Sequence, residues 1–128
     1  MPSSNLEIVH ALCMALTTGD MKRALPYLSD TLHYHNMPWA PMSGARAVAE
    51  FLQPFVDGTH CALTEMRILH AVGNGEVVMN AREETWERGA VRVVLPVAGL
   101  FVLSGGRITR WCDYWDLATF KPMLDAIG

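Results

Sequence analysis

The first half of the chain contains apolar residues at helical spacing. Ser4 and Glu7 have the spacing of a capping box, in which each side chain satisfies the other residue's backbone N–H, so a helix is predicted over Leu6–Thr17. A second amphipathic helix is predicted over Ala45–Val56. The residues expected to face inward are Val9, Leu12, Cys13 and Leu16 in the first helix and Val48, Phe51, Leu52 and Phe55 in the second.

The pattern between these two helices is less regular. Asp20 can cap a short helix that runs to Leu28, and Pro26 makes the end of this helix irregular. Apolar and polar residues then alternate over Leu32–Met37, which predicts a strand. The loop Trp39–Gly44 is unusually apolar for a surface loop, and we expect it to form the rim of a pocket.

From Thr59 onward the pattern changes to strands joined by short turns. The predicted strands are Cys61–Ala71, Glu76–Trp86, Val91–Leu103 and Arg107–Trp115. Short turns between successive strands require antiparallel pairing. The segment Leu117–Ile127 is predicted to be helical in whole or in part, capped by Asp116, and Pro122 can start a separate last turn.

Helices followed by antiparallel strands indicate one α+β domain over residues 1–128. We expect a curved, mostly antiparallel sheet, packed on the N-terminal helices, to form a cone with an internal pocket. The strand Val91–Leu103 is apolar on both faces, which is unusual for an antiparallel strand with one face in water. A second subunit is therefore expected to cover its outer face, which predicts a homodimer.

Composition narrows the class of protein. Of the 128 residues, 51% are hydrophobic and 18% are charged, and the net charge is −3. These values exclude a disordered chain and argue against nucleic-acid binding. No apolar run approaches the ~20 residues that span a membrane, and Met1-Pro2-Ser3-Ser4 lacks the basic start of a signal peptide. The scattered Cys13, Cys61 and Cys112 are typical of free thiols in a reducing compartment, so a cytoplasmic protein is expected.

The segment Trp111-Cys112-Asp113-Tyr114-Trp115-Asp116 carries the first candidate catalytic residue. Side chains on a strand alternate between faces, so Trp111, Asp113 and Trp115 are expected on one face. A carboxylate between two tryptophans on an apolar face is unfavourable unless it is paired or has a function. Asp113 is therefore the candidate base of an active site.

Two earlier strands offer polar partners for Asp113. Tyr34 and Asn36 share one face of the first strand, and Arg82 and Glu84 share the face of Trp86 on a later one. The orientation of this second pair depends on the register, because a one-residue bulge would turn Glu83 inward instead.

The expected interior set can supply both an acid and a base. Two carboxyls around one guanidinium cannot both ionise easily in a dry pocket, so one of them tends to keep a proton. Arg82 stays cationic and can bind Glu84 and Asp113 together, which fixes their geometry. Tyr34 and Asn36 can then orient a water molecule.

Each of these assignments has a structural alternative. Asp113 can simply accept backbone hydrogen bonds, and Arg82 and Glu84 can form a solvated ion pair. Tyr34 can be a core tyrosine, and Asn36 can terminate its strand. The residues expected to bind substrate, Trp39, Met42, Trp86, Trp111 and Trp115, are of types that also build a plain core.

A metal site is not expected. His33 and His35 lie on the other face of their strand, away from the pocket, and no third ligand stands at metal spacing. The glycine-containing turns at residues 73–75 and 105–106 do not open helices, so they do not form a phosphate cradle.

Three motifs together resemble a known family. Tyr34-His35-Asn36-Met37-Pro38, Arg82-Glu83-Glu84 and Trp111–Asp116 are similar, in this order, to the motifs of limonene-1,2-epoxide hydrolases, which have the nuclear-transport-factor-2-like cone fold. The likeness covers nearly the whole chain, from the first helix to Phe120. It implies a hydrolase that needs water, an apolar epoxide and no cofactor.

The resemblance also implies roles for the five interior residues. Asp113 would take a proton from a water held by Tyr34 and Asn36, and the water would open the epoxide without a covalent enzyme intermediate. Arg82 would tie the base to a second acid that protonates the epoxide oxygen. The family pattern is R-x-D whereas this chain has R-x-E, so Glu84 carries the acid about one C–C bond further out.

Two other functions remain open at this point. One is an isomerase or cyclase on the same cone, similar to ketosteroid isomerases or polyketide cyclases, although such proteins usually have an acidic or His base where this chain has Asn36-Met37. The other is a non-catalytic ligand-binding domain. This last alternative would be favoured if Arg82 and Glu84 faced solvent instead of converging on a water-sized site.

Overall fold

A computed structural model describes residues 4–128 of the chain; Met1 to Ser3, and with them part of the expectation about a signal peptide, lie outside the described residues. The helices are α1 (Asn5–Leu16), α2 (Ala45–Val56) and α3 (Leu117–Ile127), with two short 3-10 turns, η1 (Met21–Arg23) and η2 (Leu25–Tyr27). The strands are β1 (Leu28–Asn36), β2 (Met42–Ser43), β3 (Ala62–Asn74), β4 (Val77–Arg88), β5 (Val91–Ser104) and β6 (Arg107–Tyr114).

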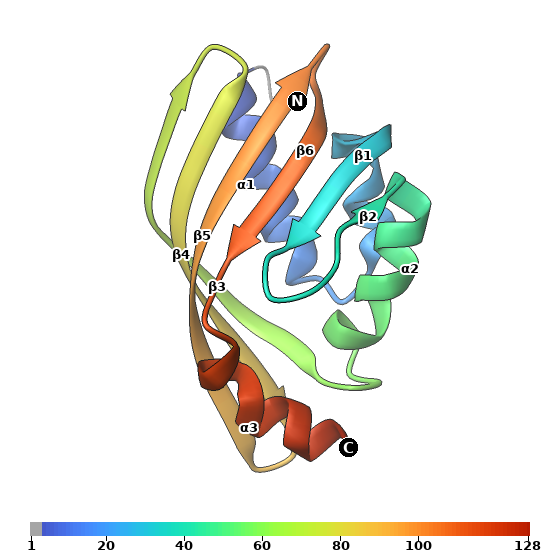
Figure 1. The fold of residues 1–128 in the computed structure, drawn as a ribbon, viewed down its shortest axis with the longest axis vertical. Coiled ribbons are helices and arrows are strands. Elements are labelled where there is room, and N and C mark those ends of the chain that lie inside the picture. The colour runs from blue at the N-terminus through green and yellow to red at the C-terminus, as the bar shows by residue number, and fades with distance from the viewer. Residues whose placement is uncertain (1–3) are drawn as a thin grey trace.

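The six strands form one curved, open sheet in the order β2-β1-β6-β5-β4-β3 (Figure 1). Strands β3 to β6 pair antiparallel through short turns, as predicted. Strands β1 and β6 pair in parallel, and their register sets Tyr34 beside Trp111 and Asn36 beside Asp113. The sheet therefore brings the first and last candidate site segments together.

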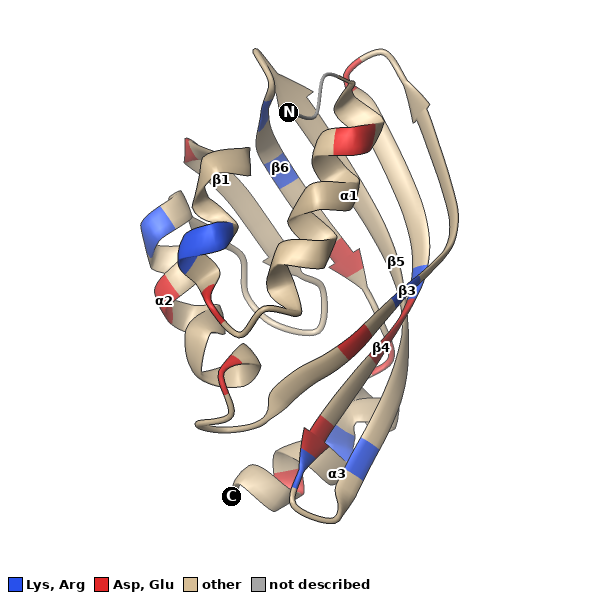
Figure 2. Ribbon diagram, turned by 180° about the vertical axis from the view of Figure 1, so that it is seen from behind, with Lys and Arg blue, Asp and Glu red and all other residues tan. Residues whose placement is uncertain are grey.

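The helices enclose one side of the sheet. Figure 2 shows α1 crossing the sheet and α2 lying beside β1, while α3 lies at the opposite end and packs on β4 and β5. The predicted capping box of α1 is present, because Ser4 Oγ accepts from the Glu7 N–H and Glu7 Oε1 accepts from the Ser4 N–H. The α+β class and the packing of helices on a curved sheet are confirmed.

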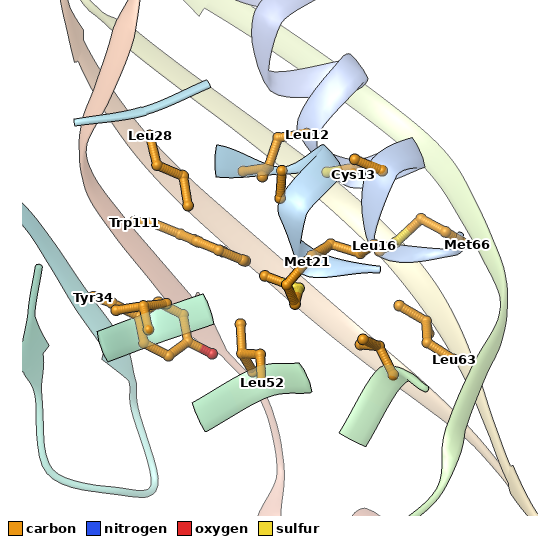
Figure 3. Close-up of a cluster of buried hydrophobic side chains, with 14 of the residues drawn as sticks. Leu12, Cys13, Leu16, Met21, Leu28, Tyr34, Leu52, Leu63, Met66 and Trp111 are labelled. Carbon is orange, nitrogen blue, oxygen red and sulfur yellow. The ribbon is translucent and has the colours of Figure 1, made fainter. Parts of the chain in front are cut away.

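A single apolar cluster fills the space between helices and sheet (Figure 3). Its side chains come from every layer: Leu12 and Leu16 on α1, Leu52 on α2, and Leu28, Leu63 and Trp111 on the strands. The four residues predicted to face inward from the first helix, Val9, Leu12, Cys13 and Leu16, are all buried. Burial of this surface is what fixes the strands that carry the candidate site.

Several element boundaries differ from those predicted. The segment after Asp20 forms two 3-10 turns in place of one helix, and β1 begins at Leu28, four residues before the predicted start. The apolar loop after Pro38 contains the short edge strand β2, which pairs with β1. Strand β6 ends at Tyr114, so Trp115 lies just beyond the strand on which it was predicted.

The convex face of the sheet keeps apolar side chains in contact with solvent. The exposed ones include Val72 (66%), Val77 (39%), Met79 (48%), Val94 (39%) and Tyr114 (47%), and Val72 on β3 is paired in register with Met79 on β4. Long stretches of β3, β4 and β5 carry no charged residue, as Figure 2 shows. Within residues 4–128, no helix is both long enough and apolar enough to cross a membrane.

Candidate active site

A cavity lies between the sheet and helices α2 and α3. Its volume is about 50 Å³, which exceeds the roughly 10–15 Å³ that one water molecule needs. The lining side chains are Leu16, Tyr34, Asn36, Trp39, Phe51, Leu52, Phe55, Val56, Leu63, Glu84, Trp86, Leu95, Trp111, Asp113, Trp115 and Phe120. The wall is thus mainly apolar and aromatic, with a few polar groups.

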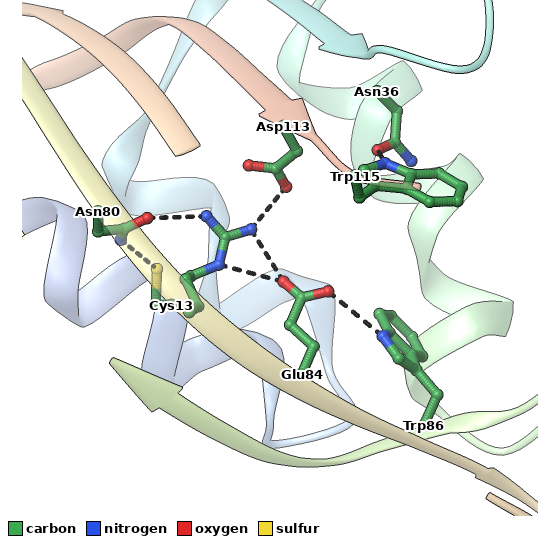
Figure 4. Close-up of polar contacts among 8 residues, drawn as sticks. Cys13, Asn36, Asn80, Glu84, Trp86, Asp113 and Trp115 are labelled. Atoms are coloured by element: carbon green, nitrogen blue, oxygen red, sulfur yellow. Dashed lines mark hydrogen bonds and ion pairs between the residues drawn. The ribbon is translucent and has the colours of Figure 1, made fainter. Parts of the chain in front are cut away.

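Arg82 joins the two candidate carboxyls (Figure 4). Its Nη2 donates to Glu84 Oε2 at 2.8 Å and to Asp113 Oδ2 at 2.7 Å, and its Nε donates to Glu84 Oε2 at 3.2 Å. The guanidinium is fully buried, and the two carboxyls are nearly so. A cation shared by two buried carboxyls holds both in a fixed relative position.

The register of β4 directs this network inward. Strand β4 pairs with β5 without interruption from Val77 to Arg88, so no bulge alters its alternation. Arg82 and Glu84 therefore point inside, while Glu83 points outside and pairs with Arg67 at 3.2 Å. Solvent-facing Arg82 and Glu84 side chains would have favoured the non-catalytic alternative, and both side chains are instead buried.

Burial and neighbouring charges together set the protonation of the network. Burial raises the pKa of Glu84, and the nearby Asp113 carboxylate raises it further, although Arg82 acts in the opposite direction. Burial alone would lower the pKa of Arg82, but Asp113 and Glu84 more than offset this and hold the pKa well above its ordinary value. Glu84 is therefore the carboxyl that tends to keep a proton, and Arg82 stays cationic.

Asp113 retains capacity to accept a proton. Its Oδ2 accepts one hydrogen bond, from Arg82, and its buried Oδ1 has no hydrogen-bond partner among the described residues. A carboxylate offers about four acceptor positions, so most of those of Asp113 are unused. The indole Nε1 of Trp111 is likewise buried without a partner in residues 4–128.

Tyr34 and Asn36 lie on β1 and line the same cavity as the two carboxyls. Burial raises the pKa of Tyr34 well above its ordinary value, and Asp113 and Glu84 add to the rise, so its hydroxyl stays protonated. Asn36 Oδ1 accepts a hydrogen bond from the indole Nε1 of Trp115. Four of the five polar residues predicted for the interior, Tyr34, Asn36, Glu84 and Asp113, thus line one cavity, and the fifth, Arg82, is bonded to its two carboxyls without lining it.

Four of the five residues predicted to bind substrate line the cavity: Trp39, Trp86, Trp111 and Trp115. Met42 does not line it. Because Met42 lies on the edge strand β2, it packs against the apolar cluster from the side of β1. The cavity wall also includes Phe51 and Phe55 of α2, which sequence analysis assigned only to the core.

Sequence analysis missed two residues that shape the network. Asn80 Oδ1 accepts from Arg82 Nη1 at 2.9 Å, and Asn80 Nδ2 lies 3.6 Å from Cys13 Sγ. Gly99 on β5 lies between Asn80 on β4 and Asp113 on β6 in the strand register. The signals were present, because Asn80 lies two residues before Arg82 on the same face and a glycine inside a strand often marks a close approach.

The histidines and cysteines lie apart from this chemistry. His33 and His35 do not line the cavity, and no group of three or more His, Cys, Asp or Glu side chains within the described chain is arranged to hold a metal ion. All three cysteines are buried and free. Burial raises the pKa of both Cys13 and Cys61 to about 11, so both thiols are neutral near pH 7.

Comparison with known proteins identifies the family. A family profile described as "Limonene-1,2-epoxide hydrolase catalytic domain" matches residues 3–125. The chain belongs to the limonene-1,2-epoxide hydrolase family. The resemblance seen in the three motifs is therefore confirmed. As a member of the limonene-1,2-epoxide hydrolase family, the protein is an epoxide hydrolase, an enzyme that acts on an ether bond.

Individual relatives agree with this family. Epoxide hydrolase EphG of Mycobacterium tuberculosis is 31% identical over 117 residues, which cover 91% of this chain and 76% of the relative. The solved structure of an M. tuberculosis limonene-epoxide-hydrolase-like epoxide hydrolase has a TM-score of 0.81 at 29% identity, covering 95% of this chain and 90% of the other.

More distant structures show the fold alone. A SnoaL-like polyketide cyclase candidate from Shewanella putrefaciens has a TM-score of 0.76 at 18% identity, covering 93% of this chain and 84% of the other. The predicted cone fold is confirmed by these neighbours. Their identity is too low to carry an activity to this chain.

Proposed function

We propose that this protein opens a small apolar epoxide to a diol by direct attack of a water molecule, without a cofactor. The observation that carries the proposal is the shared guanidinium: Arg82 Nη2 donates to both Glu84 and Asp113 beside a mainly aromatic cavity. A carboxyl that keeps a proton and a carboxylate that accepts one, fixed on one cation, are the acid and base that hydrolysis of a strained cyclic ether uses.

Asp113 is the proposed base. Its carboxylate takes a proton from water while the water oxygen forms a bond to an epoxide carbon. The water then has one O–H and one lone pair left for Tyr34 and Asn36, which hold it in place. A water fixed in this way attacks as if the reaction were intramolecular, which removes much of the entropic barrier.

Glu84 is the proposed acid, and Arg82 is the cation that holds acid and base together. As the epoxide C–O bond breaks, the departing oxygen takes the proton of Glu84 and becomes the second hydroxyl. Glu84 Oε2 already accepts two hydrogen bonds from Arg82, whereas Oε1 accepts one, from the Trp86 N–H, so Oε1 is the atom proposed to carry the proton. After one turnover Asp113 is protonated and Glu84 is ionised, and proton exchange with water restores the starting state.

The cavity wall supports an apolar substrate. Trp39, Trp86, Trp111 and Trp115 present aromatic surface, and Phe51 and Phe55 extend it along α2. Apart from the buried network, the lining contains no charged side chain that would bind an anionic or cationic substrate. A cyclic, terpenoid-like or aryl epoxide fits this chemistry, because its hydrocarbon part gains from burial against the wall.

The first experiment is diol formation from a panel of cyclic and aryl epoxides in ¹⁸O-labelled water, with Asp113→Asn as the comparison. The native protein is expected to place one labelled oxygen in the diol even in a single turnover, and Asp113→Asn is expected to lose ~10³-fold or more of the rate. Circular dichroism and thermal unfolding would show that the variant is folded. An active Asp113→Asn variant, or no diol from any epoxide, would overturn the proposal.

We further propose that two copies pair through the convex face of the sheet. Val77, Met79, Val94 and Tyr114 form an exposed apolar surface there, and surfaces of this kind commonly mark subunit interfaces. In a two-fold symmetric dimer both subunits use the same surface, so this one apolar face is sufficient to form the interface. The three buried free thiols are consistent with a reducing, cytoplasmic location, which we also keep as a proposal.

A further inference from the structure

Two tryptophans do more than line the cavity. The indole Nε1 of Trp86 donates to Glu84 Oε1 at 3.3 Å, and the indole Nε1 of Trp115 donates to Asn36 Oδ1 (Figure 4). Each indole therefore contacts a different polar group of the site. Trp86 contacts the Glu84 oxygen to which Arg82 does not donate.

Both indoles rest on one residue of the C-terminal helix. Phe120 of α3 packs edge-to-face against Trp86, with centroids 5.7 Å apart, and against Trp115, with centroids 5.6 Å apart. The Phe120 side chain is 4% exposed, so its position is fixed by packing. Aromatic pairs in this geometry contribute about 0.5–1.5 kcal/mol each beyond the area they bury.

We propose that Trp86, Trp115 and Phe120 are positioning residues: the two indole N–H groups orient the acid Glu84 and the water-holding Asn36, and Phe120 fixes both indoles from α3. This inference rests on the proposed function of Glu84 and Asn36. It adds that the C-terminal helix, which supplies none of the reacting groups, sets the geometry of two of them.

The hydrogen bond from Trp86 has a specific electrostatic consequence. An N–H that donates to Glu84 Oε1 stabilises the ionised carboxyl more than the protonated one, so it favours the charge that develops as the proton leaves. The ionisable groups that face Glu84 are Arg82 on β4, Asp113 on β6, Tyr34 on β1 and Cys13 on α1. Trp86 adds a neutral dipole to this set and no charge.

The hydrogen bond from Trp115 determines the orientation of an amide. An indole N–H can only donate, so the Asn36 atom that faces it is the amide oxygen. Asn36 Nδ2 then remains as the donor that reaches a lone pair of the attacking water. Since that water needs its second lone pair for the epoxide carbon, the Tyr34 hydroxyl accepts a hydrogen bond from the water's remaining O–H and does not donate to the water.

The length of the Glu84 side chain explains why it needs the hydrogen bond from Trp86. The side chain of Glu has one more rotatable bond than that of Asp, so its carboxyl requires a contact on each oxygen to stay in one position. Arg82 holds Oε2, and Trp86 holds Oε1. The departure from the R-x-D pattern is thus accompanied by a tryptophan two residues later that fixes the longer acid.

The test compares Trp86→Phe and Trp115→Phe, which keep an aromatic ring and remove the N–H. Trp39→Phe is the matched control, because Trp39 packs against Trp115 at 5.2 Å but its own Nε1 makes no hydrogen bond to the described residues. Steady-state epoxide hydrolysis is measured as kcat, KM and pH profile. The Glu84 carboxyl is titrated by ¹³C NMR without substrate, and the indole resonances are followed by ¹⁵N NMR.

Trp86→Phe is expected to raise the pKa of Glu84, move the alkaline limb of the rate profile to higher pH and lower kcat ~10-fold, the size of one hydrogen bond to a charged group. Trp115→Phe is expected to lower kcat to a similar extent with no change in the pH profile, because Asn36 does not ionise. Trp39→Phe is expected to change KM alone. Phe120→Leu is expected to shift the ¹⁵N resonances of both indoles and to lower kcat.

Two results would overturn the inference. One is a native Glu84 titration in Trp86→Phe, and the other is a native kcat in both indole variants. The titration needs no substrate, so it judges the inference even if the native protein forms no diol from any epoxide. Absence of diol would count against the proposed function. The NMR titration of Glu84 would still decide whether Trp86 positions Glu84.

Discussion

Gly99 on β5 is paired in register with Asp113 on β6, and the absence of a side chain at Gly99 gives Arg82 its path to the carboxylate. A Cβ on Gly99 would collide with Arg82 Nη1 and would lie 2.7 Å from both Asn80 Oδ1 and the Phe101 ring. The guanidinium therefore passes over the backbone of β5 between the strands that carry acid and base. No other residue type leaves that space open.

Gly99→Ala is expected to displace Arg82 and abolish most activity, by ~10²-fold or more, since displacements near 1 Å at a reacting group have effects of that size. Gly73→Ala is the control, because it is also a glycine-to-alanine change in a strand and its Cβ would meet its nearest atom at an ordinary 3.6 Å. Epoxide hydrolysis and thermal unfolding of both variants provide the measurement. Equal activity of the two variants would contradict the role assigned to Gly99.

Glu84→Asp tests whether the longer acid is required. The substitution restores the R-x-D pattern but draws the carboxyl back by one carbon, away from the Trp86 N–H that it contacts at 3.3 Å. We expect kcat to fall ~10²-fold with the fold intact. The kcat of Glu84→Gln is expected to be lower still, because an amide cannot donate an acidic proton. An Asp variant as active as the native enzyme would show that the cavity accepts either acid.

The raised pKa of Glu84 predicts a pH dependence of stability. A folded-state pKa above the ordinary value of 4.5 means that, between these two values, the folded protein binds more protons than the unfolded chain. The stability that Glu84 contributes is therefore complete below pH 4.5 and is lost as the pH rises through the folded pKa. Urea unfolding from pH 4 to 8 would measure this loss.

Glu84→Gln is the control for this measurement of stability against pH, because a Gln side chain does not ionise. The free energy of unfolding of Glu84→Gln minus that of the native protein is expected to increase with pH and then level off. Titrations shared by both proteins cancel in this difference. A flat difference across the range would mean that Glu84 ionises in the folded protein as it does in the unfolded chain.

The convex face predicts a concentration-dependent dimer. Met79→Asp places a charge within the exposed apolar surface, where Met79 is 48% exposed, and is expected to give a monomer in light scattering after gel filtration. Lys22→Asp, a charge change at an exposed position on η1, serves as the control and should leave the mass unchanged. A native protein that is already monomeric at high concentration would contradict the dimer.

Much of the fold follows from local patterns. The bounds of α2 and α3 agree with those predicted, because the apolar spacing of α2 and the Asp116 cap of α3 are local signals, and α3 continues through Pro122 as one helix. The start of β1 was missed because Ser29, Asp30 and Thr31 are polar and partly exposed; pairing of Leu28 with Ile108 on β6 extends the strand there. Such pairing joins distant segments, and no local pattern reveals it.

The candidate site was also predictable only in part. The inward orientation of Arg82 and Glu84 follows from strand alternation once β4 contains no bulge. The contacts of Trp115 with Asn36 and of Arg82 with Asn80 depend on side-chain positions that alternation does not specify. Sequence analysis therefore identifies the reacting groups more readily than the groups that hold them.

The parallel pairing of β1 with β6 has a consequence for biosynthesis. Asn36 and Trp115 are 79 positions apart, and Asp113 joins Tyr34 and Asn36 only when the last strand is added to the sheet. Contacts across so long a separation form late and slowly. A ribosome-bound chain that has not yet released β6 has no complete active site, so the onset of activity during synthesis reports the completion of folding.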